Sequence, residues 1–506
     1  MNQETPSAAS SCSDAASSAE TAATAADIDA RVVREANPMG TQPIGKLIAQ
    51  FSIPTIVMMV FNSLYNIIDT AFLQVAVPVI GAAVTQIAYP VQTILMGFSM
   101  LGGIGGNAMA AIELGRGNDE KVEKILGNTA VLLFGIAVIV GVCSVLFADP
   151  LLTALGASQE LWEPAKGFIT IVCVGFAFQS LGMGMNNFLR TAGKPNLSLV
   201  CSILGTAACI VLNYIFVVRL GWGVNGSAYA TVIGQGFSMV PVMLFFIVYK
   251  GSAFKLRLRN CVPDMRLIID ICALGLASFA IQVAQTAVTI VMNHVIGIWG
   301  AQDPMGFETA LSTISIAWKV LSIAYMPIIG LTSGVQPLLG FNVGAQLWGR
   351  VLKLYKWACI DCFLVAGVFQ LVFWIVPEAP LTLFSVREDL MPFACDTIRM
   401  FSFWLAPVGF QIMASSYFQS SGQPMKATVL ELTRQFLFLI PLYLLMPGFA
   451  VSVLGMSGLD GVRLAPPISD IMAFVVTVVF FVSEWNKLKR LEKTSGHLAA
   501  SVGPQA

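Results

Sequence analysis

Residues 130–147 read AVLLFGIAVIVGVCSVLF and contain no charged side chain. The hydrocarbon core of a bilayer is about 30 Å thick, and an α-helix of about 20 mainly apolar residues can cross it. Lys121 and Lys124 precede this stretch, and Asp149 follows it. The segment therefore predicts a membrane-spanning helix over 124–148.

The same pattern extends over most of the chain. Of its 506 residues, 56% are hydrophobic and 11% are charged, with a mean hydropathy of +0.78. Ordinary soluble domains carry about 25% charged residues. Twelve apolar segments predict an all-α polytopic membrane protein with twelve transmembrane helices. They are 46–73, 79–110, 124–148, 164–190, 197–219, 226–250, 265–298, 307–339, 351–376, 390–420, 427–448 and 466–486.

The positions of Lys and Arg predict the orientation of these helices. Of the 28 basic residues, 21 lie in the tails and in the even-numbered loops. The odd-numbered loops carry four, namely Lys166, Arg219, Arg387 and Arg463. Cytoplasmic loops are enriched in Lys and Arg. We therefore expect a multi-pass protein of the cell (plasma or inner) membrane with both termini in the cytoplasm.

The two halves of the sequence resemble each other. NFLRTAGKP at 187–195 corresponds to YFQSSGQP at 417–424, and Gly117 in ELGRGN corresponds to Gly344 in GFNVGAQ. Six helices per half is an even number, so the halves would be related by an axis along the membrane normal. The sequence predicts two pseudo-symmetric six-helix lobes with a ligand cavity between them. The expected parts are a disordered cytoplasmic tail (1–44), an N-terminal lobe (45–250), a cytoplasmic linker (251–264), a C-terminal lobe (265–486) and a cytoplasmic tail (487–506).

Several functions are disfavoured by the composition. The formal net charge is zero, so no overall field attracts nucleic acid. The only histidines are His294 and His497, and no nucleophile, metal-ligand set or acid pair is clustered in the sequence. We therefore expect no enzyme activity and no cofactor or metal. The glycines of GGIGG at 102–106 lack the Lys-Ser/Thr of a phosphate loop, and they are typical of close helix packing in membranes.

One carboxyl group stands out within the predicted spans. Asp69 lies near the end of the first span, and Asn62 and Tyr65 share its helical face, with Asn66 nearby. An ionisable group in a membrane helix is costly and is a functional candidate. Asp69 either caps the helix end at the interface or binds a coupling proton or Na⁺. Pro54, earlier in the span, is a candidate hinge because proline removes a helix hydrogen bond.

Several motifs together resemble those of the MATE (multidrug and toxic compound extrusion) transporter family, closest to its bacterial DinF-like and MepA-like branch. They are LYNIIDTAF at 64–72, the stretch from Leu220 to Thr231, GVQPLLGFNVGAQ at 334–346 and YFQSSGQP at 417–424. The similarity covers about residues 45–490. It implies a twelve-helix fold of two lobes and secondary antiport of organic compounds driven by H⁺ or Na⁺.

The resemblance also implies a set of site residues. In the family's first lobe, the first-helix Asp gathers with polar groups at the positions of Asn186, Asn213 and Thr231. A second family Asn is Cys209 here, which favours H⁺ over Na⁺ as the coupling ion.

The second lobe has Gln282, Gln285 and Gln411 near positions where some branches carry acids, so coupling through this lobe is not expected. With Asn62 and Asn66, these glutamines would line the substrate cavity, although helix packing is an alternative role. Within the spans, Glu431 and Arg434 are expected to form a structural pair, whereas Lys319 has no assigned role.

The sequence thus predicts an antiporter that exports small organic, multidrug-like compounds in exchange for H⁺ or Na⁺. Its partners are the small organic substrate and the lipid bilayer, and we expect a monomer. The alternative is a flippase for lipid-linked precursors from the same wider superfamily. Twelve spans and an interior with few charges argue against that alternative.

Overall fold

The computed structural model describes residues 37–76, 80–154, 159–249, 254–382, 386 and 388–501, and these contain helices and no β-strand. The first half comprises α2 (Pro38–Thr41), α3 (Ile44–Ala76), α4 (Ile80–Arg116), α5 (Asp119–Leu146), α6 (Ala148–Ala154), α7 (Gln159–Val174), α8 (Phe176–Thr191), α9 (Pro195–Asn213), the π-helix η1 (Tyr214–Arg219) and α10 (Gly223–Val248). The second half comprises α11 (Met265–Gly300), α12 (Phe307–Gly344), α13 (Trp348–Ile375), α14 (Glu378–Thr382), η3 (Glu388–Leu390), α15 (Met391–Phe401), α16 (Leu405–Ser420), α17 (Pro424–Leu432), η4 (Thr433–Leu439), α18 (Ile440–Phe449), η5 (Ala450–Leu454) and α19 (Gly458–Ser501). The 3₁₀-helix η2 (Leu258–Cys261) lies between the halves.

Each predicted span coincides with a helix or with a group of consecutive helices. Within the described residues, ten helices are long and apolar enough to cross a membrane. A further span is the pair α7–α8, bent by 45° at Gly175. The segment predicted over 390–420 forms α15 and α16, which are separated at residues 402–404. The all-helical, polytopic fold class is therefore confirmed.

The ends of the chain differ in detail from the expected tails. Residues 1–36 lie outside the described residues, but the last part of the expected tail forms α2, whose first turn is capped by the side chain of Asn37. Arg350 donates hydrogen bonds to the carbonyl oxygens of Met39 and Gln42. At the other end, α19 continues to Ser501. The chain therefore enters its first span from a fixed position against α13.

The two halves repeat the same packing. Helix α3 packs on α9 as α11 packs on α17, and α4 packs on α5 as α12 packs on α13. Residues in the left-handed region end matching helices: Gly117 (φ +81°) and Gln346 (φ +57°), then Gly193 (φ +76°) and Gly422 (φ +75°). The structural partner of Gly117 is therefore Gln346, not Gly344 as the sequence suggested. One offset of 229 residues relates both pairs.

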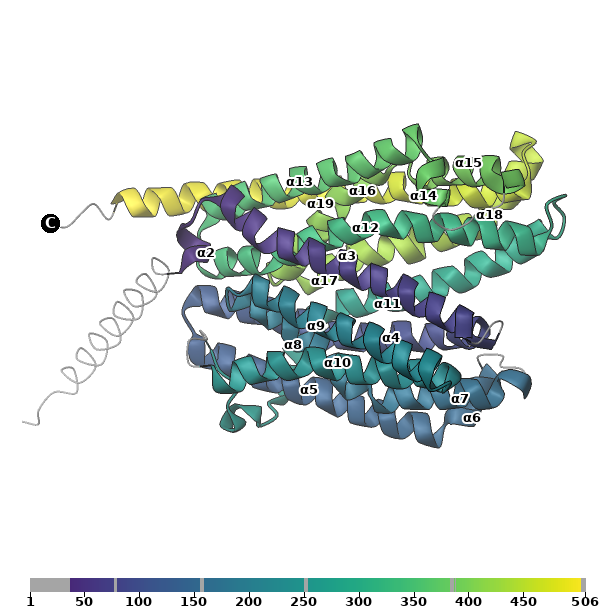
Figure 1. Cartoon of the computed structure of the whole chain (residues 1–506). Helices are drawn as coiled ribbons and strands as arrows, with labels where there is room; N and C mark the ends of the chain where they lie inside the picture. Colours follow the sequence, from purple (N-terminus) through teal and green to yellow (C-terminus); the bar gives the residue numbers. More distant parts are fainter. Residues whose placement is uncertain are drawn as a thin grey trace, which may run out of the picture.

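The halves meet mainly where α4 contacts α11 and α12 and where α3 contacts α12. In Figure 1, α5, α8 and α10 lie on one side of the bundle, and α13, α16 and α19 lie on the other. Backbones approach closely at glycines: a Cβ on Gly105 or Gly275 would overlap backbone of the facing helix, and so would one on Gly344. Within α4, α11 and α12, these glycines lie toward the end of the bundle that carries α2. We call this contact the glycine seam.

The GGIGG motif is confirmed as a packing element. Gly102 and Gly106 face α5, Gly103 faces Gly184 of α8, and Gly105 faces α11. Because these glycines admit three different neighbours, α4 contacts three other helices over little more than one turn. Helix α4 is therefore one of the links between the two halves, together with the contact of α3 on α12.

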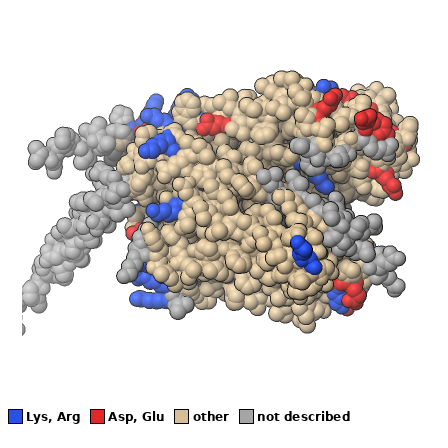
Figure 2. Space-filling model, viewed as in Figure 1, with Lys and Arg blue, Asp and Glu red and all other residues tan. Residues whose placement is uncertain are grey.

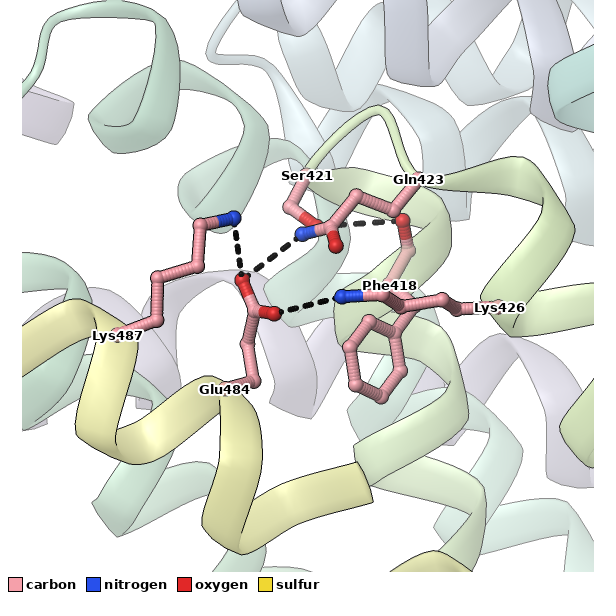
Figure 3. Close-up of polar contacts among 6 residues, drawn as sticks. All are labelled: Phe418, Ser421, Gln423, Lys426, Glu484 and Lys487. Carbon is pink, nitrogen blue, oxygen red and sulfur yellow. Dashed lines mark hydrogen bonds and ion pairs between the residues drawn. The ribbon is translucent and has the colours of Figure 1, made fainter.

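Charged side chains gather toward the ends of the bundle. On the face shown in Figure 2, most Lys and Arg lie near the end that carries α2, and a broad uncharged band covers the middle. At that end Glu484 of α19 is buried and accepts hydrogen bonds from Gln423 (2.9 Å), Lys426 (3.0 Å) and Lys487 (3.2 Å) (Figure 3). This cluster fixes α19 to the turn between α16 and α17.

Candidate functional site

A polar seam runs between α3 and α9 in the first half. The hydroxyl of Ser202 donates to the sulfur of Met58 (3.0 Å), and the hydroxyl of Thr206 donates to Asn62 Oδ1 (3.4 Å). Both pairs are 144 residues apart in sequence. The two helices therefore run parallel and in constant register along this seam.

The register indicates which positions come next along the helices. If the offset of 144 continues, residue 69 of α3 is level with Asn213 of α9. The backbone of α3 is described to Ala76, but the side chains of Tyr65, Asn66 and Asp69 lie outside the described residues. Asn213 is fully buried at the last turn of α9. On this register, the backbone of residue 69 would lie at the depth of Asn213.

Thr231 lies in the same layer. The thiol of Cys209 donates to the carbonyl oxygen of Thr231 (3.8 Å), and Gly234 packs directly against Cys209. Cys209 is one turn before Asn213 on α9, so Thr231 of α10 lies beside the last two turns of that helix. Asn213 and Thr231 therefore lie in one layer of the first half.

Asn186 lies at a different depth, contrary to the expected grouping. Its amide nitrogen donates to Ser202 Oγ (3.0 Å) and to Met58 Sδ (3.6 Å). Ser202 precedes Asn213 by three helical turns, which correspond to about 16 Å along α9. Asn186 cannot contact a ligand held between residue 69 and Asn213. The amide was assigned from a family position, and sequence alone does not show the depth at which α8 crosses α9.

Two members of the seam were not predicted from the sequence. Ser202 and Thr206 lie on the same face of α9 as Cys209 and Asn213, since the four follow helical spacing of four, three and four residues. This spacing was visible in the sequence. Small polar residues are common in membrane helices, however, so only the contacts with α3 identify the stripe as a seam.

Pro54 lies where α3 packs against α12. It is buried within a continuous helix, and the hydroxyl of Thr55 donates to the carbonyl oxygen of Phe51 (2.8 Å). The neighbours of Pro54 contact two glycines of α12, because Gly330 faces Ile56 and Gly334 faces Ser52. A bend at Pro54 would therefore change the contact between the halves.

The residues proposed for the cavity are in different environments. Gln282 is buried opposite Gly97 at the contact between α4 and α11, where Phe98 and Phe279 also meet with ring centroids 5.0 Å apart. Gln285 is exposed, whereas Gln411 is buried inside the second half. Of these three glutamines, Gln282 is the one that lies between the halves. Asn62, which was also proposed for the cavity, contacts Thr206 within the first half.

Comparisons with known proteins identify relatives along most of the chain. The family profile MatE matches residues 54–215 and 276–445, one stretch in each half. Multidrug export protein MepA of Staphylococcus aureus (strain MSSA476) is 22% identical over 409 residues, which are 80% of this chain and 87% of that protein. The protein of the same name from Staphylococcus haemolyticus (strain JCSC1435) is 22% identical over 396 residues, covering 77% and 84% of the two chains.

Solved structures share the fold. A crystal structure of MATE in complex with MaL6 superposes with a TM-score of 0.82 at 21% identity, covering 90% of this chain and 99% of that chain. An outward-facing multidrug resistance MATE family transporter of the MOP superfamily has a TM-score of 0.80 at 22% identity, with 91% and 98% covered. At 21–22% sequence identity, the structural similarity shows that the helices are arranged alike, and it shows the fold alone.

Proposed function

The chain belongs to the MatE family, and from this premise we propose that it exports small organic compounds across the plasma membrane in exchange for H⁺. It is a multi-pass membrane transporter and not an enzyme. The relatives named multidrug export protein support efflux of drug-like compounds as the transport activity. We place both ends of the chain in the cytoplasm, in line with the distribution of Lys and Arg.

The glycine seam is the observation that carries this proposal. Two halves of like packing touch backbone to backbone at one end of the bundle, across α4, α11 and α12. Such a contact can open as one rigid body moves against the other, which is the basis of alternating access in transporters with repeated halves. In the proposed cycle, substrate enters between the halves when the seam is open and leaves at the opposite side when it is closed.

Asp69 is the proposed coupling group of the first half. The register between α3 and α9 supports this role, because it brings position 69 level with Asn213 and Thr231. A carboxylate in an apolar environment is more costly than the protonated acid. Proton uptake would therefore favour a different position of α3, and Pro54 is the proposed bending point.

Transport by the purified chain in liposomes tests the proposal. We expect efflux of a fluorescent cationic dye to follow an imposed pH gradient, and Asp69→Asn to abolish this gradient-driven efflux while the variant still folds and inserts. Asn66→Asp with Asp69→Asn serves as a matched variant that restores a carboxyl one turn away. Undiminished efflux by Asp69→Asn would reject the coupling role, and efflux driven only by a Na⁺ gradient would reject H⁺ as the coupling ion.

A further inference from the structure

A second polar cluster lies inside the second half, where sequence reasoning expected no coupling. Arg434, in the π-helix η4, donates from Nε to Asp470 Oδ1 of α19 (2.8 Å) and from Nη2 to the hydroxyl of Tyr325 on α12 (3.0 Å). The side chain of Asp470 is 7% exposed and that of Arg434 is 15% exposed. The predicted pair of Glu431 and Arg434 is therefore wrong, since the partner of Arg434 is Asp470.

Glu431 is left as an additional carboxyl group beside this ion pair. It precedes Arg434 by one turn, is partly buried, and lies beside the hydroxyl of Ser415 on α16. Among the described residues, Glu431 forms no ion pair within 4.0 Å. One guanidinium thus lies near two carboxyl groups and neutralises only one of them. An unpaired carboxylate at this depth carries a large desolvation cost.

The location of Glu431 corresponds to the polar seam of the first half. Adding the repeat offset of 229 residues to Asn186 and Ser202 gives Ser415 and Glu431. In the first half Asn186 donates to Ser202 across α8 and α9, and in the second half Ser415 of α16 lies beside Glu431 of α17. Equivalent helices therefore bring the equivalent positions together in both halves, and only the second half has a carboxyl group there.

Two further observations indicate that the cluster is more than a structural ion pair. Gln411 lies one turn before Ser415 on α16 and is 5% exposed, and within the described part of the chain its Oε1 has no hydrogen-bond partner. The hydroxyl of Ser469 donates to the backbone carbonyl oxygen of Arg434 (3.0 Å), a group available because η4 is not regular α-helix. Buried polar atoms are nearly always satisfied, and π-helical segments are frequent at functional sites.

The other groups that face Glu431 leave it without a second cation. Helix α16 has no charged side chain, and α11 has none between Asp270 and His294. Asp470 comes from α19 and Tyr325 from α12, and both accept hydrogen bonds from Arg434. Arg434 is therefore the one positive charge near Glu431 among these residues.

We propose that Glu431 is a proton-binding group of the second half, held by Ser415 and by the Arg434–Asp470 pair. Proton binding makes the cluster neutral, and proton release leaves one excess negative charge. Tyr325 connects the cluster to α12, the helix whose Gly330 and Gly334 contact α3. A change in the charge of Glu431 can thus alter the contact between the halves. This inference adds a second group to the proton coupling proposed above and rests on that function for its role in transport.

Infrared difference spectroscopy of the full chain in lipid nanodiscs, titrated with pH and without substrate or gradient, tests the proposal. In a chain that carries Asp69→Asn, we expect a carbonyl-stretch band of a protonated carboxylic acid that disappears as pH rises and that is absent when Glu431→Gln is added. Ser415→Ala should retain the band with a shifted midpoint. Asp470→Asn should lose the band although Glu431 is present, because Arg434 then pairs with Glu431.

Each outcome bears directly on Glu431. An unchanged band in Glu431→Gln would overturn the assignment, and so would a band that does not change with pH. Loss of the band on addition of Na⁺ at constant pH would replace the proton with a bound cation and would also overturn it. The measurement requires no transport, so a failure of the proposed efflux activity would be distinguished from a failure of this inference.

Discussion

At the scale of single residues, one buried carboxyl group connects a helix to the turn and the helix that pack against it. Glu484 shows this at the end that carries α2: its side chain is 2% exposed and contacts Gln423, Lys426 and Lys487. The two lysine side chains are 40% and 55% exposed, so the carboxyl group is the buried member of the cluster. Removing the carboxyl group of Glu484 would leave the amide of Gln423 and the ammonium groups of both lysines without this acceptor. Removing an exposed lysine would leave the other contacts of the carboxyl group in place.

Glu484→Ala should therefore lower the stability of the second half. The loss of hydrogen bonds to a buried charged group costs about 1–3 kcal/mol, which thermal unfolding in detergent would detect as a lower apparent Tm. Lys487→Met is the matched control and should leave the Tm nearly unchanged, because surface pairs contribute about 0–1 kcal/mol. Equal effects of the two substitutions would show that the cluster is not centred on the carboxyl group.

At the scale of helices, the glycine seam sets how closely the halves can approach. A Cβ on Gly344 of α12 would overlap the carbonyl oxygen of Ile112 on α4. Gly344→Val should oppose closure at this end by about 1–3 kcal/mol, the usual cost of overpacking. That cost corresponds to a shift of about five- to 150-fold in the closing equilibrium. Gradient-driven dye efflux should fall accordingly.

Gly297→Ala of α11 is the control for this prediction. A Cβ there would meet only Phe307 at 3.7 Å, which is an ordinary contact. Efflux by this variant should match that of the unmodified chain, since alanine also has the higher helix propensity. If Gly344→Val transported as fast as Gly297→Ala, the seam would not be part of the transport cycle.

Helices were predictable from the sequence to the extent that hydropathy determines them. The span over 265–298 matches α11 closely, because a bilayer requires long apolar segments whatever their neighbours. The bend at Gly175 and the π-helix η4 were not predicted, since both preserve the apolar pattern. Contacts between helices were the least predictable: the spacing of Glu431 and Arg434 suggested a pair, but Asp470 lies 36 residues from Arg434.

For the candidate site too, spacing along one helix was predictable from the sequence, and contacts between helices were not. The first-half stripe on α9 could be identified from helical spacing, and Asn213 and Thr231 do lie in one layer. The depth of Asn186 depends on where α8 crosses α9, which no periodicity reveals. The second-half cluster was missed because its members come from α12, α16, α17, η4 and α19, and only Glu431 and Arg434 lie near each other in the sequence.

At the scale of the whole molecule, alternating access requires that the two ends of the bundle change in opposite directions. Lys124 on α5 and Lys356 on α13 are exposed near the end with the glycine seam, one in each half. Thr153 on α6 and Gln302, just after α11, are exposed toward the opposite end. Spin labels at each pair, introduced in a chain whose exposed Cys143 is replaced, would report the two separations.

Acidification should lengthen the distance between Lys124 and Lys356 and shorten the distance between Thr153 and Gln302. The reason is that protonation removes the charge of Asp69 and Glu431, so the arrangement that buries these groups becomes less costly. Double electron–electron resonance would measure both distances in nanodiscs. Asp69→Asn combined with Glu431→Gln should make both distances independent of pH, and either substitution alone should leave part of the response. If both distances lengthened on acidification, the halves would separate as a whole. That result is incompatible with a rocking motion of one half against the other.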